Sequence, residues 1–188
     1  MTIAALLVDL DGTLVDTSRA NYEAYAAALR TAGVTVTRAA FDEVAAGRNW
    51  RQFLPGLLAA HGSEADPAAI AALKTELYPG KLGFSLVNTP LVALIAAGRP
   101  GWKTALVTTA SGPNAAAVLA HHRLEDLFDL VVTGSDVSRH KPDPEAYVAA
   151  AAKLGSSPDQ CLIVEDSDIG VAAAAAFGAP CLRVSFPM

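Results

Sequence analysis

The chain has little of what marks secreted, membrane-spanning or nucleic-acid-binding proteins. It contains only two cysteines, Cys161 and Cys181, each in a strand-like segment, so two buried thiols are expected and not a disulfide. It has no apolar run that approaches the roughly 18 residues needed for a membrane-spanning helix. Its basic residues form no run and its net charge is −5, whereas nucleic-acid-binding proteins usually carry a basic stripe. We therefore expect neither a membrane protein nor a nucleic-acid-binding one.

The N-terminal stretch also lacks the cationic start of a secretion signal, and Asp9 interrupts its apolar run. A cytoplasmic location is therefore expected. What is present is the composition of an ordinary globular protein, with 52% hydrophobic and 18% charged residues. A length of 188 residues is sufficient for one substantial core and a small accessory unit, which could exist as a monomer or as a weak homo-oligomer.

The first part of the chain has an apolar strand at Ile3–Val8 and then changes to helical periodicity. Helices are predicted at 18–32, 37–46, 50–61 and 67–77, with glycine and proline near their ends. Such a group of helices, with no convincing strand among them, indicates a small bundle inserted into a second domain. The predicted domains are accordingly a helical one at 17–84 and a discontinuous one made of 1–16 and 85–188.

Beyond Phe84, strands and helices alternate. Strands are predicted at 103–107, 130–132, 161–164 and 181–184, with helices between them. The last helix has two candidate capping residues, Ser167 and Asp168. Strands regularly separated by helices indicate a doubly wound parallel sheet, so the predicted fold is an α/β, Rossmann-like core with a small inserted all-helical cap.

The end of the first strand is the most informative stretch, because Asp9 and Asp11 are followed there by Gly12. A strand buried on both faces does not normally end in two carboxylates unless they bind something, since an unpaired buried charge is costly. Mg²⁺ suits such a pair because it binds one or two carboxylates and completes its shell with water and phosphate oxygens. The alternative is a solvated turn, in which Asp and Gly are also common.

Other polar residues also follow predicted strands. Thr108 follows the second strand, Lys141 lies in the loop after the third, and Glu165 and Asp166 follow the fourth. In an open parallel sheet the carboxyl ends of the strands line one edge, where ligands bind. These residues are therefore expected to converge with Asp9, and their chemistry suits a phosphate and a metal ion.

These segments resemble the four motifs of the haloacid dehalogenase-like hydrolases, and in particular the C1-capped branch of phosphatases and phosphoglucomutase-like enzymes. The matching segments are Asp9-Leu10-Asp11-Gly12-Thr13-Leu14-Val15-Asp16-Thr17, Leu106-Val107-Thr108-Thr109, Lys141-Pro142-Asp143-Pro144-Glu145 and Val164-Glu165-Asp166-Ser167-Asp168-Ile169-Gly170. They occur in the family's order, so the resemblance covers nearly the whole chain.

The resemblance implies a role for each matching residue. Asp9 would be a nucleophile that becomes an aspartyl-phosphate, and Asp11 would be a general acid and base. Thr108 and Lys141 would act on the phosphoryl group. The implied cofactor is Mg²⁺, with metal-binding positions at Asp9, Asp11, Asp166 and Glu165.

Substrate contacts are less well defined. Thr109 is an alternative to Thr108 for contact with the phosphoryl group. Arg48, Asn49 and Arg51 lie at a helix–helix junction of the insertion, where they could contact a phosphate or carboxylate of the substrate. Solvated surface arginines are the alternative, because exposed charges are weak evidence of a site.

The predicted function is a Mg²⁺-dependent phosphomonoester hydrolase, that is, a phosphatase, which acts on a small phosphorylated metabolite. A phosphosugar mutase of the same family is an alternative, although the well-known mutase branch carries a histidine in the first helix of the insertion, where this chain has Asn21. A metal-independent haloacid dehalogenase and a non-catalytic binding protein are further alternatives. The sequence does not name the substrate.

Overall fold

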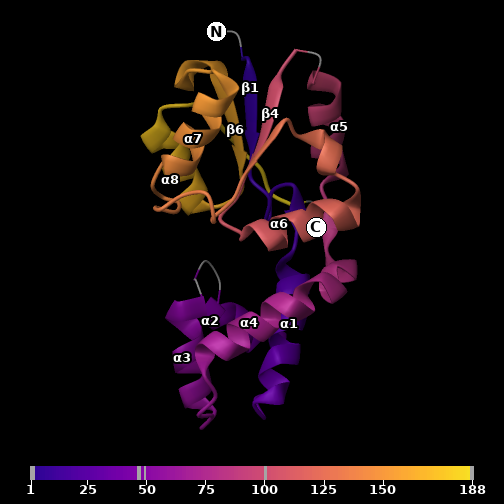
Figure 1. Cartoon of the computed structure of the whole chain (residues 1–188), viewed down its shortest axis with the longest axis vertical. Coiled ribbons are helices and arrows are strands. Elements are labelled where there is room, and N and C mark those ends of the chain that lie inside the picture. The colour runs from indigo at the N-terminus through magenta and orange to yellow at the C-terminus, as the bar shows by residue number, and fades with distance from the viewer. Residues whose placement is uncertain (1–2, 46–47, 49, 100, 187–188) are drawn as a thin grey trace. The chain divides into compact units, whose positions relative to one another are not determined.

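The structure, a computed structural model, describes residues 3–45, 48, 50–99 and 101–186, and it divides into two compact units (Figure 1). One unit consists of Met1–Asp16 and Leu86–Met188, and the other is Thr17–Ser85. The first is an α/β unit and the second is a helical unit. The chain therefore enters the helical unit after sixteen residues and later returns to complete the α/β unit.

The α/β unit is built on a five-stranded sheet with the strand order β5-β4-β1-β6-β7, in which every neighbouring pair is parallel. The strands are β1 (Ala5–Val8), β4 (Lys103–Val107), β5 (Leu130–Val132), β6 (Cys161–Glu165) and β7 (Cys181–Arg183). In the central register, Leu7 of β1 pairs with Ala105 on one side and Ile163 on the other. The predicted parallel α/β fold is confirmed.

Helices lie on both sides of this sheet, with α7 and α8 on one side and α5 and α6 on the other (Figure 1). They are α5 (Thr89–Gly98), α6 (Gly112–His122), α7 (Glu145–Leu154) and α8 (Asp168–Phe177), with short 3₁₀ turns η2 (Glu125–Leu127) and η3 (Pro158–Gln160). Burial on both faces explains why β1 is apolar at every position. On one face of the sheet, residues such as Leu7 and Ile163 belong to the same buried cluster as Tyr147 of α7 and Ala173 of α8.

A second, two-stranded sheet was not predicted. It consists of β2 (Val15–Asp16) and β3 (Leu86–Val87), which pair antiparallel. Strands of two residues are too short to give a periodic signal in the sequence. This ribbon contains the last residues before the helical unit and the first residues after it.

The helical unit contains α1 (Ser18–Thr31), α2 (Arg38–Ala45), α3 (Trp50–Ala60), α4 (Pro67–Leu77) and the 3₁₀ helix η1 (Tyr78–Phe84). Its core includes an aromatic cluster in which the rings of Tyr25, Phe41 and Phe53 have centroids 5.4 to 5.7 Å apart. No strand occurs among the described residues of this unit. The fourth helix ends at Leu77 as predicted, and Pro79 and Gly80 lie in the 3₁₀ helix η1 that follows it.

Among the helices in the described ranges, none combines the length and apolar character required to cross a bilayer.

Both cysteines are free thiols; Cys161 is buried as predicted, whereas Cys181 is only half-buried.

Candidate active site

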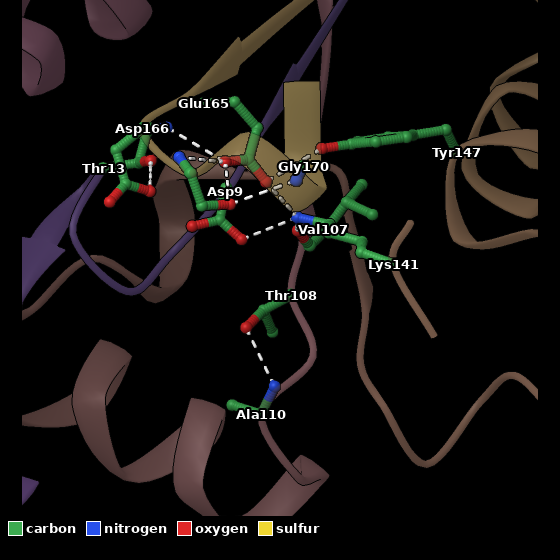
Figure 2. A network of polar contacts seen from close by, with 11 residues as sticks. Asp9, Thr13, Val107, Thr108, Ala110, Lys141, Tyr147, Glu165, Asp166 and Gly170 are labelled. Atoms are coloured by element: carbon green, nitrogen blue, oxygen red, sulfur yellow. Dashed lines mark hydrogen bonds and ion pairs between the residues drawn. The ribbon is translucent and has the colours of Figure 1, made fainter. Parts of the chain in front are cut away.

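Four of the predicted site residues meet at the carboxyl edge of the central strands (Figure 2). Asp9 directly follows β1, Glu165 ends β6 with Asp166 after it, and Lys141 reaches them from the loop after β5. The backbone N–H of Asp9 donates to the carbonyl of Val164, which continues the β1–β6 pairing to the site. The parallel arrangement thus brings together residues that are up to 157 positions apart in the chain.

Lys141 is the centre of this cluster. Its Nζ donates hydrogen bonds to Asp9 Oδ1 at 2.7 Å, to Glu165 Oε1 at 2.6 Å and to the carbonyl of Val107 at 3.0 Å. The side chain is only 2% exposed. Burial alone would lower the pKa of Lys141, but the neighbouring carboxylates of Asp9 and Glu165 outweigh it and raise that pKa, which favours the charged ammonium form.

Glu165 is fully buried and its carboxylate accepts hydrogen bonds at both oxygens. Oε1 accepts from Lys141 and from the hydroxyl of Tyr147 at 3.3 Å. Oε2 accepts from the backbone N–H of Asp166 at 2.9 Å and from the N–H and hydroxyl of Ser167 at 3.0 and 2.9 Å. Burial opposes its ionisation, but Lys141 and these donors lower the pKa of Glu165 overall. The residue is therefore held as a carboxylate that anchors Lys141.

Glycines allow the chain to pass close to both acidic residues. Gly12 has a φ of +86°, and a Cβ there would clash with the carboxylate of Asp166. A Cβ at Gly170 would clash with the carboxylate of Glu165. Thr13 follows Gly12 and donates from its hydroxyl to Asp166 Oδ1 at 3.0 Å (Figure 2). Gly12 and Thr13, in the loop after β1, thus pack closely against Asp166, the residue after β6.

Asp9, Glu165 and Asp166 form an acidic cluster in which one carboxylate oxygen of each lies within 4.8 Å of the others. Burial is the main cause that raises the pKa of Asp9 to about 7, against the opposing effect of Lys141. Burial also raises the pKa of Asp166, while the hydrogen bond from Thr13 lowers it. Oxygen donors in this arrangement could hold a hard divalent cation.

Thr108 follows β4 and is 2% exposed. Its hydroxyl accepts a hydrogen bond from the backbone N–H of Ala110 at 3.0 Å, which shapes the turn before α6. Thr109 is exposed. Asp11 is half-buried, and its backbone forms an isolated β-bridge with Val15. Their contacts with a phosphoryl group or a metal stay predictions.

The predicted substrate-binding residues of the insertion belong to the helical unit. Arg48 and Arg51 are exposed, and they contact the carbonyl of Val44 and the ring of Trp50, respectively. Asn49 lies outside the described residues. Their part in substrate binding stays a prediction.

The choice between two capping residues for α8 is resolved. Ser167 is the N-cap, and its hydroxyl accepts from the backbone N–H of Gly170 at 3.1 Å. Asp168 is the first residue of the helix and pairs with Arg183 at 2.7 Å on the exposed surface.

Sequence reasoning missed three residues whose hydrogen bonds reach the acidic cluster or the loop after β1. Thr13 lies inside the first motif, next to residues that were identified, so its position was a usable signal. Asn88 precedes Thr-Pro at the start of a helix, which indicates a cap but nothing more. Tyr147 lies in an alanine-rich helix, where nothing in the sequence distinguishes it from an ordinary core residue.

An acidic, lysine-containing cluster thus lies at the carboxyl edge of a parallel sheet, which is where α/β proteins of this class bind their ligands. The chain belongs to the haloacid dehalogenase-like hydrolases, because the sequence model of that family matches residues 3–178. The resemblance seen in the sequence motifs is thereby confirmed.

Relatives in this family support a phosphatase. The fructose-1-phosphate phosphatase YqaB of Escherichia coli is 32% identical over 175 residues, covering 93% of each chain. Hexitol phosphatase A of the same organism is 33% identical and covers 100% of this chain and 85% of its own. The crystal structure of CbbY from Rhodobacter sphaeroides in complex with phosphate has a TM-score of 0.84 at 26% identity, covering 98% of this chain and 87% of that one.

Proposed function

We propose that this chain is a Mg²⁺-dependent phosphatase that hydrolyses small phosphorylated sugars or sugar alcohols through an aspartyl-phosphate on Asp9. One observation carries the proposal. The Asp9 carboxylate lies at the end of β1, bonded to Lys141 at 2.7 Å and clustered with Asp166. A carboxylate in this position would serve as a nucleophile, because the Lys141 ammonium and a candidate metal ligand lie beside it.

The residues of the cluster fit a divalent cation. Asp9, Glu165 and Asp166 contribute three carboxylates, whereas the ion pairs of the described residues bring one ammonium, that of Lys141, to them. A divalent cation would balance the remaining negative charge. Because Glu165 already accepts five hydrogen bonds, we assign the metal to Asp9 and Asp166, with the backbone carbonyl of Asp11. Bound Mg²⁺ would supply positive charge to the phosphoryl oxygens.

The first chemical step would transfer the phosphoryl group to the enzyme. A carboxylate oxygen of Asp9 forms a bond to phosphorus while the bond from phosphorus to the ester oxygen breaks. Asp11 gives its proton to the departing oxygen, which leaves as an alcohol. Lys141 and the hydroxyl of Thr108 stabilise the charge on the phosphoryl oxygens.

The second step would restore the enzyme. Asp11, now a carboxylate, accepts a proton from a water molecule as its oxygen attacks phosphorus. The bond between Asp9 and phosphorus breaks, and inorganic phosphate is released. Asp9 returns as a carboxylate and Asp11 as the protonated acid, so the cycle is complete.

The substrate class is proposed from the relatives. Two are named for fructose 1-phosphate and for hexitol phosphates, and CbbY has also been solved in complex with xylulose-(1,5)-bisphosphate. The names refer to phosphorylated sugars and to hexitols, which are sugar alcohols. The exposed Arg48 and Arg51 of the helical unit, together with Asn49, are our candidates for contact with such a substrate.

The proposal is tested by measuring phosphate release from a panel of sugar and sugar-alcohol phosphates, with and without Mg²⁺. We expect release that requires Mg²⁺ and stops when EDTA is added. Full activity in EDTA would contradict the metal assignment, and no release from any phosphate ester would contradict the function. Conversion of a sugar phosphate into an isomer, with no free phosphate, would instead identify the phosphosugar mutase.

A further inference from the structure

Asn88 lies where the chain returns from the helical unit to the α/β unit. It directly follows β3 and is the buried N-cap of α5. Its side-chain Oδ1 accepts a hydrogen bond from the backbone N–H of Leu91 at 3.2 Å. An acceptor oxygen alone is sufficient for this cap, and Asp or Ser would provide one equally well.

The side-chain nitrogen of Asn88 makes a contact that helix capping does not require. Nδ2 donates to the carbonyl of Thr13 at 3.1 Å. The backbone N–H of Asn88 donates to the carbonyl of the next residue, Leu14, at 2.9 Å. Asn88 therefore binds two consecutive residues of the loop that follows Asp9 and Asp11, although it is 75 positions from Thr13 in the sequence.

Thr13 connects this contact to Asp166. Its side chain is fully buried, and its hydroxyl donates to Asp166 Oδ1 at 3.0 Å (Figure 2). The preceding Gly12 passes so close to Asp166 that an added Cβ would clash with the Asp166 carboxylate. The position of the Thr13 backbone thus decides where its hydroxyl meets the carboxylate, and outer hydrogen bonds of this kind orient metal ligands.

We propose that Asn88 is a positioning residue, which orients the Asp166 carboxylate for metal binding by holding the backbone of Thr13. This inference rests on the proposed function, because it takes Asp166 to be a Mg²⁺ ligand. It goes beyond that function in assigning a role at the metal site to Asn88, the residue that directly follows β3.

Two substitutions separate positioning from capping. Asn88→Asp and Asn88→Ser both keep an acceptor for Leu91 and remove the amide donor to Thr13. Asp66→Asn is the matched control, because Asp66 caps α4 in the helical unit with an acceptor oxygen bonded to the N–H of Ala68. Thr13→Val, alone and combined with Asn88→Ser, tests whether the effect passes through Thr13.

The readout is the Mg²⁺ dissociation constant of the apoprotein by isothermal titration calorimetry, with phosphate release from p-nitrophenyl phosphate measured in parallel. We expect each Asn88 variant to bind Mg²⁺ about tenfold more weakly, at the low end of the losses caused by removing outer partners of metal ligands. KM at saturating Mg²⁺ should be unchanged, as should Mg²⁺ binding by Asp66→Asn. In the Thr13→Val background, replacing Asn88 should cause little further loss.

Wild-type Mg²⁺ affinity in folded Asn88 variants would overturn this inference alone. Losses that simply add in the double variant would also overturn it, as would failure of both Asn88 variants to fold, since Asn88 would then serve the fold only. A wild-type protein that binds no Mg²⁺ and releases no phosphate would overturn the proposed function, and this inference with it.

Discussion

Lys141 holds one buried positive charge between two carboxylates. Its three hydrogen bonds go to Asp9, Glu165 and the carbonyl of Val107, so each donor of the ammonium has a partner. Removing one member of a buried ion pair leaves an uncompensated charge, which costs more than the pair contributes. A substitution that removes one of these charges therefore leaves its partner charge buried and unpaired.

Asp9→Asn keeps the shape of the side chain and an oxygen that can accept from Lys141, but it removes the nucleophile. We expect phosphate release to fall by about three orders of magnitude or more, as when a covalent nucleophile is lost in other enzymes. Phosphate release from p-nitrophenyl phosphate measures the effect, and a circular dichroism spectrum checks that the fold is retained. Activity above a tenth of the wild-type value would remove Asp9 from the nucleophile role.

Tyr147→Phe tests the support of Glu165 from α7. The hydroxyl of Tyr147 donates to Glu165 Oε1 at 3.3 Å, and its ring centroid lies 5.0 Å from Lys141 Nζ. Phenylalanine keeps the ring and removes the hydrogen bond, so we expect a loss of about 0.5–1.5 kcal/mol in the free energy of unfolding. Urea unfolding measures it. An unchanged unfolding midpoint would show that this hydrogen bond contributes nothing to stability.

At the scale of elements, the loop after β1 depends on Gly12. Gly12→Ala places a Cβ both at a φ of +86° and against the Asp166 carboxylate, so we expect a loss of stability together with weaker Mg²⁺ binding. Gly33→Ala is the matched control: its φ is +72°, but nothing lies within 4 Å of the added Cβ. Both variants should lose about 1–2 kcal/mol through backbone strain. Calorimetry should show weaker Mg²⁺ binding in Gly12→Ala only, and equal binding would contradict the clash.

Asp129 joins the start of β4 to the start of β5 and predicts a pH dependence. The backbone N–H of Thr104, followed by the hydroxyl of Thr104 and the guanidinium of Arg99, lowers the pKa of Asp129. A carboxylate with a lowered pKa stabilises the fold above its unfolded pKa of about 3.9, and this stability is lost as the pH falls through the folded pKa.

We therefore expect Asp129→Asn to be less stable than the wild type at pH 7, by less than about 1 kcal/mol because the side chain is 41% exposed. The difference should shrink as the pH falls below about 4. Urea midpoints of both proteins from pH 7 to pH 3 measure it, and a gap that stays constant over this range would contradict the assignment.

Much of the element pattern was predictable because long buried segments have clear periodicity. The strands at 103–107 and 130–132 and the helix at 67–77 have the predicted bounds. The two residues of β2 and the two of β3 are too few for any pattern, and η1 continues through a Pro-Gly pair that normally ends a helix. Such short elements are set by tertiary contacts, which a linear pattern does not contain.

The convergence of the acidic residues was predictable for a different reason. Charged residues at the carboxyl ends of apolar strands must meet at one edge of a parallel sheet, so the sequence alone predicts that Asp9 and Asp166 converge. The supporting hydrogen bonds of Tyr147 and Asn88 were not, because their sequence surroundings are those of an ordinary core residue and an ordinary cap. Which core residue touches the site depends on packing geometry alone.

At the scale of the whole molecule, the two units have separate hydrophobic cores. One core lies between the sheet, α7 and α8, and the other includes Phe53 with Tyr25 and Phe41 in the helical unit. Phe53→Ala should destabilise the helical unit by about 3–5 kcal/mol, because it leaves a cavity in an aromatic cluster. Hydrogen exchange should then speed up within Thr17–Ser85 and remain slow in the sheet.

Leu7→Ala removes buried side-chain volume at the centre of β1, in the core of the α/β unit. This substitution should accelerate amide hydrogen exchange in the sheet and leave exchange in the helical unit slow. Equal acceleration in both units after Phe53→Ala would show that they unfold as one cooperative body.

The position of β1 in the sheet also constrains the order in which the protein can fold during synthesis. β1 is made first, yet its two neighbours are β4 and β6, whose residues are translated about 100 and 155 positions later. The complete helical unit is translated in between. During most of its synthesis the nascent chain must therefore carry β1 as an apolar, unpaired segment. Until β6 (Cys161–Glu165) has been translated, β1 is open to binding by a chaperone.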